Sequence, residues 1–256
     1  MNKKPHSIPE RTIKPIQERF VSMSNALARS AQGLRLSEKR TVSLALAKTD
    51  SMPIKDLTLS TMGDAGFTVR LTAAEYAESY DVDSDTAYDQ LKAAGDYLMD
   101  RKVRTFKIKG KGYTEIKTNW CSEAQYQAGE GWIQISFTPQ ISKHLLGLRT
   151  AFTSYKLNQA SALRSIYSWR LFECLQSWKK TGVWSPTIEE FHQAMEAPQT
   201  CCNNFGQLRL KVIEPALKEL REKDNMDIDY ELEKAGRKVV GLIFRFQKNA
   251  QGALDL

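Results

Sequence analysis

A stretch in the last quarter of the chain, residues 203–247, constrains the fold more than any other part of the sequence. Its first half carries apolar residues at three- and four-residue steps, which places them on one face of a helix: Phe205, Leu208, Val212, Ala216, Leu217 and Leu220. Two alternating apolar runs follow, at residues 226–230 and 239–246, with a slip at Gly241. The segment between them, EKAGRK, holds a glycine among cations. We predict one amphipathic helix followed by a β-hairpin with a basic turn.

The polar face of this helix carries side chains that suit DNA. Asn203, Gln207 and Lys211 fall opposite the apolar face, where amide groups can hydrogen-bond base edges and a lysine can neutralise a phosphate. A helix of this kind followed by a hairpin with a basic tip is typical of a winged helix, whose helix enters the major groove while the wing follows the backbone. The alternative interpretation is a common packing unit whose basic turn is simply solvated.

Length, charge and the amino terminus narrow the class of protein. The 256 residues suffice for two domains of ordinary size. Lysine and arginine outnumber aspartate and glutamate by 37 to 30, and the net charge of +7 suits a polyanionic partner. The first residues lack the apolar core of a signal peptide, and no run approaches the roughly 18 apolar residues of a membrane span. We expect a cytoplasmic protein with no membrane partner and a flexible amino-terminal arm over residues 1–19.

Catalysis and metal binding are not indicated by the residue patterns. The four cysteines show no Cys-x-x-Cys spacing, and the three histidines lie far apart. The one acidic cluster, Asp81-x-Asp83-x-Asp85, is explained by a turn and a helix start, where carboxylates are favoured. A phosphate-binding Gly-x-x-x-x-Gly-Lys-Ser/Thr loop is missing from the sequence, as is the His-x-His pair of a DNA-nicking enzyme. We predict no enzymatic activity, no metal and no cofactor.

A first helix-turn-helix is predicted in the amino-terminal half. Residues 67–71 alternate as a short strand, and Thr72 caps a helix through Tyr80 with Glu75 completing a capping box. Ser84 opens a second helix after a tight turn, which gives the skeleton of a helix-turn-helix. The second helix is acidic, which argues against a strong role in base contacts: Asp85, Asp89 and Asp96.

A cationic hairpin follows this helix-turn-helix. Residues 101–117 hold seven lysines and arginines and a single acid, Glu115, with Gly110 and Gly112 around the turn. This one-sided charge favours phosphate contact over a merely soluble hairpin. A further hairpin is expected through residues 120–137, and its edge and aromatic side chains either form a dimer surface or belong to the core.

The rest of the second half completes a similar order of elements. We predict a short helix over residues 139–149, a long buried helix over 157–178, and a helix capped by Thr187, which pairs with the helix at 203 as a second helix-turn-helix. The predicted fold is therefore α+β, with two tandem winged-helix domains. The predicted boundaries are an arm at 1–19, a first domain at 20–148, a second domain at 149–248 and a tail at 249–256.

Several of these residues together resemble a known family. They are Phe205, Arg209, Val212, Pro215-Ala216, Glu219-Leu220, Lys234-x-Gly236-Arg237-Lys238 and Phe244-x-Phe246, with weaker segments at 36–40, 67–80 and 165–175. In these features the chain resembles the iteron-binding plasmid replication initiators of bacteria, the Rep proteins built from two winged-helix domains. The resemblance implies that the carboxy-terminal winged helix binds the repeats in the major groove, while the amino-terminal one contributes backbone contacts and a dimer interface. It also implies that monomers bind direct repeats at the origin and help to open it, and that dimers repress their own promoter at an inverted repeat.

The resemblance also implies roles for particular residues and partners. The implied base-contacting residues are Asn203, Asn204, Gln207 and Arg209, with Arg209 at the flank of the exposed face. The implied backbone-contacting residues are Lys211, Lys234, Arg237 and Lys238, together with Arg104, Lys107, Lys109 and Lys111 in the first hairpin. Where many relatives carry basic residues early in this helix, the chain has Gly206, Gln207 and Leu208, which predicts a different preference among bases because amides favour adenine and arginine favours guanine. The implied partners are double-stranded DNA, a second copy of the chain, the host initiator and the replicative helicase.

Two other functions are alternatives to plasmid replication. A winged-helix transcriptional regulator would need only an operator, whereas an initiator needs several direct repeats beside its gene. A structural or partner-binding protein would leave both basic hairpins without a purpose.

Overall fold

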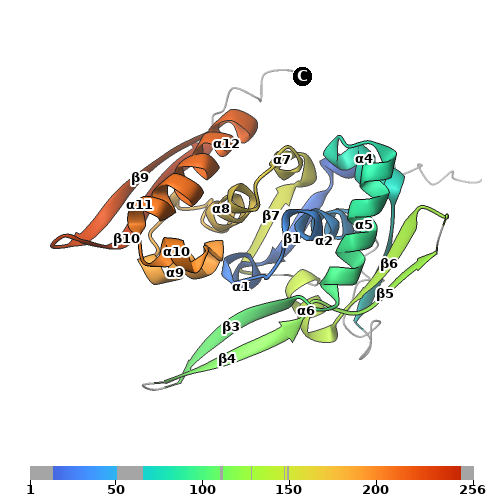
Figure 1. The fold of residues 1–256 in the computed structure, drawn as a ribbon, viewed down its shortest axis with the longest axis horizontal. Coiled ribbons are helices and arrows are strands. Elements are labelled where there is room, and N and C mark those ends of the chain that lie inside the picture. Colours follow the sequence, from blue (N-terminus) through green and yellow to red (C-terminus); the bar gives the residue numbers. More distant parts are fainter. Residues whose placement is uncertain are drawn as a thin grey trace, which may run out of the picture.

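The computed structural model describes residues 14–50, 66–109, 112–127, 129–146, 148 and 150–248 (Figure 1). The predicted tail and most of the predicted arm lie outside the described residues. At the end of the arm, Ile16–Glu18 form a short 3-10 helix in which Ile16 is buried. The Gln17 side chain donates a hydrogen bond of 3.0 Å to the Glu78 carboxylate, so this end of the arm packs on the folded body.

Helix start signals in the sequence predict two helical pieces over residues 21–46, the first from residues 22–25 and the second from Ser37, but the body of the chain begins with a strand. Strand β1 (Phe20–Ser24) is followed by the short helix α1 (Asn25–Arg29) and by α2 (Leu36–Thr49). The second predicted helix start, at Ser37, lies within one residue of the observed one. The first piece forms only as the short α1, for which Ser24 is the cap. The residues before it form β1, which pairs with β7 (Phe152–Lys156), and a partner so distant in sequence leaves no local signal.

The first helix-turn-helix and its hairpins form as predicted. The elements are β2 (Phe67–Thr72), α4 (Ala73–Tyr80), α5 (Ser84–Leu98), β3 (Lys102–Lys109), β4 (Gly112–Asn119), β5 (Cys121–Gln127), β6 (Trp132–Phe137) and α6 (Pro139–Leu145). Thr72 and Glu75 make the expected capping box, and Asp81 takes the left-handed conformation in the turn between the helices. Strands β2, β6 and β5 form one antiparallel sheet, while β3 and β4 form a separate two-stranded ribbon, the first wing.

The long helix predicted over residues 157–178 is wrong, because the chain forms α7 (Leu157–Ser161) and α8 (Ile166–Ser177) with a break between them. At the break, the carboxylate of Glu219 accepts the backbone N–H groups of Arg164 and Ser165, at 2.6 and 3.3 Å. The Ser165 hydroxyl then accepts the N–H of Tyr167 at the start of α8. Backbone groups freed by the break are thus satisfied from a distant helix.

The last part of the chain forms a second helix-turn-helix with its own hairpin. Its elements are β8 (Val183–Trp184), α9 (Ile188–Met195), α10 (Gln199–Cys202), α11 (Phe205–Leu208), a π-helical turn (Arg209–Ile213), α12 (Glu214–Asp224), β9 (Met226–Ala235) and β10 (Lys238–Lys248). Thr187 and Glu190 make the predicted capping box at α9. Strands β9 and β10 form the second wing, and β8 completes a three-stranded sheet with the order β8-β10-β9.

A buried ionic network joins the two halves around α8. This helix packs against α12 and α9 on one side and against α1 and β7 on the other (Figure 1). In this network Glu173 of α8 forms ion pairs with Lys39 of α2 at 2.5 Å and with Arg170 of α8 at 3.1 Å, and all three side chains are buried. Burial lowers the pKa of Lys39 to about 8, although Glu173 opposes the change. The network fixes α2 against α8, which holds the two helix-turn-helix units in one arrangement.

Candidate nucleic-acid interface

The helix predicted from residue 203 runs from Phe205 to Asp224 and is called the recognition helix below. It spans α11, the π-helical turn and α12 without interruption. The predicted apolar face is buried: Leu208, Val212, Ala216, Leu217 and Leu220 are at most 1% exposed, and Phe205 packs partly buried against the same core. Since one face is committed to the core, the opposite face is the part of the helix that is free to meet a partner.

The predicted base-contacting residues at the start of this helix have different environments. Asn203 is exposed, while Gln207 is half-buried. Asn204 is the helix cap, and its side-chain oxygen accepts the N–H of Gln207 at 3.1 Å. A base contact by Asn204 stays a prediction, and its oxygen already stabilises the helix end.

Arg209 on the recognition helix lies beside Glu214, an acid that also contacts the second wing. Its guanidinium is 3.7 Å from the carboxylate of Glu214, and Glu214 also accepts the hydroxyl of Tyr230 on β9 at 3.0 Å. Both ion-pair partners are about half exposed, so solvent screening keeps the pair weak. Lys211 is exposed and has no ion pair among the described residues.

A groove brings the start of the recognition helix and the second wing together. It has a volume of about 770 Å³, and its cationic lining comes from Arg209, Lys234, Arg237 and Lys238, with Asn203 and His192 beside them. Gln207 and Lys211 are not part of its lining. The groove therefore joins two predicted base-contacting residues, Asn203 and Arg209, to all three predicted cations of the wing.

The base of the second wing is fixed by aromatic packing. Phe244 on β10 stacks on Trp184 with ring centroids 5.4 Å apart and on Phe191 of α9 at 5.7 Å. A register shift occurs between Val239 and Gly241, where the slip was predicted. A side chain at Gly241 would place its Cβ 3.2 Å from the Pro186 carbonyl oxygen, which leaves little room for any residue but glycine. The wing is thus anchored at its base and extends past the helices toward its tip (Figure 1).

Charge changes along the second wing. Near the base, cations meet acids: Arg221 lies 3.7 Å from Asp229, and Arg245 lies 3.5 Å from Glu231. At the tip, the described part of the chain offers no ion pair to Lys234, Arg237 or Lys238. Gly236 allows the tight turn there with a φ of +63°. Among the described side chains of this wing, the cations without an ion pair therefore lie at the tip, where they are available to an external anion.

The first wing extends from the same side of the molecule as the second (Figure 1). Arg104 is exposed on β3 and has no ion pair among the described residues, whereas Lys117 across the ribbon is 3.2 Å from Glu115. Lys107 and Lys109 lie on β3, and Lys111 lies outside the described residues. Their phosphate contacts stay predictions.

Helix α5, the counterpart of the recognition helix in the first half, presents acids to solvent. Asp85, Asp89 and Asp96 are all exposed. Its single lysine, Lys92, lies 5.1 Å from the ring centroid of Tyr126 on β5. Exposed acids of this kind would repel a phosphate backbone. That this helix has no strong role in base contacts stays a prediction.

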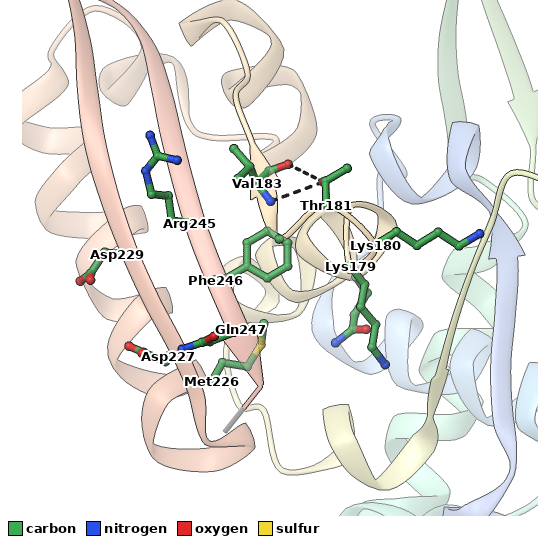
Figure 2. Close-up of a pocket in the computed structure, with 12 residues that line it drawn as sticks. Lys179, Lys180, Thr181, Val183, Met226, Asp227, Asp229, Arg245, Phe246 and Gln247 are labelled. Atoms are coloured by element: carbon green, nitrogen blue, oxygen red, sulfur yellow. Dashed lines mark hydrogen bonds between the residues drawn. The ribbon is translucent and has the colours of Figure 1, made fainter. Parts of the chain in front are cut away.

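A second cavity lies at the opposite end of the second wing from its tip and was not predicted. Figure 2 shows it between the turn after α8 and the ends of β9 and β10, with Lys179 and Lys180 on one wall and Asp227 and Asp229 on the other. Its volume is about 580 Å³. Because both signs of charge line it, this cavity does not extend the cationic surface of the tip.

Among the residues that the structure describes, no group of three or more His, Cys, Asp or Glu side chains is placed to hold a metal ion. The described helices include none that is long and apolar enough to cross a membrane.

Two family models match the chain. Residues 20–176 match the model described as Initiator Replication protein, WH1, and residues 187–246 match the one described as Initiator Rep protein, WH2. The first model continues through β7 and α8, past the boundary predicted at residue 148, and that boundary stays a prediction. Neither description names a catalytic activity.

Two proteins of Escherichia coli are similar in sequence to most of this chain. An uncharacterized 27.6 kDa protein of Escherichia coli is 27% identical over 226 residues, which is 87% of this chain and 93% of that protein. A replication initiation protein of Escherichia coli is 27% identical over 189 residues, covering 72% of this chain and 57% of that protein.

A solved structure shares the arrangement of both winged helices. It is the Pi initiator protein in complex with iteron DNA, which has a TM-score of 0.73 and 19% identity, and the match covers 91% of this chain and 99% of that one. At this identity the likeness concerns the fold alone, and it supports the α+β arrangement of two winged helices in tandem. With both family models matched in order along the chain, this protein belongs to the family of initiator replication proteins built from a WH1 and a WH2 domain.

Proposed function

We propose that this protein initiates plasmid replication by binding direct repeats, or iterons, at the plasmid origin as a monomer. In this proposal the recognition helix enters the major groove and the tip of the second wing lies on the adjacent phosphates. Binding promotes opening of the origin and recruitment of the replisome. The protein acts in the bacterial cytoplasm, where its partners include the host initiator and the replicative helicase.

One observation carries the proposal: the groove beside the recognition helix ends at three cations that lack partners in the described chain. Lys234, Arg237 and Lys238 line this groove together with Asn203 at the helix start. Phosphate contacts fix the register of a protein on the duplex, and polar side chains on the helix then select bases. The co-crystallised iteron DNA of the Pi initiator protein, which shares the fold, supports this class of ligand.

A dimer that represses its own promoter is the second part of the proposal. Strand β5 lies at the edge of the β2-β6-β5 sheet, and most of its residues are exposed. Tyr126 on this strand is 49% exposed. An unpaired edge of this kind can accept a strand from a second copy, which supports a dimer interface within residues 100–140. Hydrogen exchange there should be slower in the dimer than in the monomer, and equal exchange would assign the interface elsewhere.

A DNase footprint on the few hundred base pairs that flank the gene tests the proposal. Protection of several evenly spaced direct repeats is the expected result. Protection of a single inverted repeat would favour the alternative function, a winged-helix transcriptional regulator without a replication role. A lack of protection even at low salt would contradict DNA binding through the two winged helices.

A further inference from the structure

Leu210 is the most exposed large hydrophobic residue in the described part of the chain, with 66% of its surface accessible. It lies in the π-helical turn Arg209–Ile213, between the cations Arg209 and Lys211. A scattered exposed leucine on a protein surface needs no explanation by itself. This one stands on the solvent face of the recognition helix, where the other exposed side chains, apart from Pro215, are polar or charged.

Neighbouring side chains do not cover Leu210 on the side toward the amino terminus of the helix. Helical side chains tilt toward the amino terminus and cover the preceding turn. In that turn stands Gly206, which has no side chain to cover Leu210, and Gly206 itself is exposed. On the other side Glu214 is engaged by Arg209 and Tyr230. The result is an apolar contact point at the middle of the exposed face, with a backbone that can approach a partner closely at Gly206.

The π-helical turn sets this position. A π-turn inserts one residue into the helix, and such insertions occur frequently at functional sites. Val212 and Ile213 after Leu210 are both buried, at 1% and 0% exposure. The turn therefore keeps consecutive apolar residues in the core while it leaves Leu210 outside.

We infer that Leu210 contacts the 5-methyl group of a thymine in the repeat and so selects thymine at one position. The inference rests on the proposed function, because it needs the recognition helix in the major groove. Thymine is the one base that presents a methyl group there, and apolar side chains select it by contact. Amide and cationic neighbours cannot make this distinction, so Leu210 adds a kind of specificity that Asn203, Gln207 and Arg209 lack.

Replacing thymine by deoxyuridine removes only the methyl group and tests the contact directly. Each thymine of the protected repeat is replaced in turn, and the affinity of the full-length protein is measured for each duplex. Burial of one methyl-sized group is worth about fourfold in affinity. We expect one thymine to show a loss of about fourfold, and Leu210→Ala to bind the thymine and deoxyuridine duplexes equally well at that position.

Leu210→Met is the matched control, because methionine keeps an apolar side chain of similar volume. It should retain most of the methyl preference, and both variants should unfold at the temperature of the unchanged protein because Leu210 is exposed. A methyl preference that persists in Leu210→Ala, or a repeat without any methyl-sensitive thymine, overturns the inference. If no repeat is protected in the footprint, the proposed function fails instead, so the two failures are distinguishable.

Discussion

The two winged helices of this protein share an order of elements but differ in what their second helices present. Helix α5 carries three aspartates and one lysine, a net charge of −2 over residues 84–98. The stretch 203–213, at the start of the recognition helix, carries Arg209 and Lys211 without an acid, a net charge of +2. Both wings have cationic tips in the sequence. The difference teaches that helices in equivalent places can carry opposite net charge, and it favours the recognition helix over α5 for the major groove.

The largest effect is expected at the tip of the second wing. Replacing Lys234, Arg237 and Lys238 together by alanine should weaken binding to cognate and scrambled DNA alike, because in the proposed complex these side chains contact phosphates. At about 0.9 per phosphate contact, the slope of log affinity against log salt concentration should fall by about 2.7. Fluorescence anisotropy between low and physiological salt measures this slope. The paired change of Lys179 and Lys180 to alanine, away from the tip, is the control, and an unchanged slope in the triple variant would remove the wing from the interface.

Base selection by the recognition helix is the second test of the difference. Gln207→Ala should reduce discrimination between the cognate repeat and scrambled DNA by about 1–3 kcal/mol. Competition binding with both duplexes measures it. Lys218→Ala, at an exposed position farther along the same helix, should leave discrimination unchanged. Equal losses on both duplexes in Gln207→Ala would contradict a base contact.

Local patterns predicted the elements whose signals are local. The capping boxes at Thr72 and Thr187, the tight turn before Ser84 and the slip at Gly241 each depend on residues within a few positions. The apolar face of the recognition helix was also correct, because a stripe at three- and four-residue steps has one interpretation as a helix.

Features that depend on partners distant in the chain could not be predicted from the sequence. Strand β1 exists because β7 pairs with it, and the break before α8 is stabilised by Glu219 from another helix. Within the interface, Leu210 was not singled out, since a hydrophobic residue in a helix is first assigned to the core. The π-helical turn that exposes Leu210 has no sequence signature. The position of Leu210 between the cations Arg209 and Lys211 is the signal that could have identified it as exposed.

The first wing should contribute less than the second, and without sequence preference. Arg104→Ala should lower the salt slope by about 0.9, the value for one phosphate contact. Discrimination between cognate and scrambled DNA should not change, because a backbone contact carries no base information. The same anisotropy titrations measure both quantities. A change in discrimination would show that the first half also selects bases and would remove the distinction between the two halves.

The smallest effect is expected from neutralising α5. Changing Asp85, Asp89 and Asp96 to asparagine removes three exposed negative charges from the first half, while Asp83, which caps the helix at Thr86, is kept. If α5 stays outside the groove, its charges act on DNA only through solvent, where the screening length is about 8 Å at physiological salt. Binding should then tighten slightly and equally on cognate and scrambled DNA, with a larger gain at low salt. Thermal unfolding should show only a small loss of stability, because an acid near a helix start contributes about 0.3–1 kcal/mol to the free energy of unfolding. A gain confined to the cognate repeat would place α5 against bases, and the acidic surface would then regulate affinity rather than mark a helix excluded from DNA.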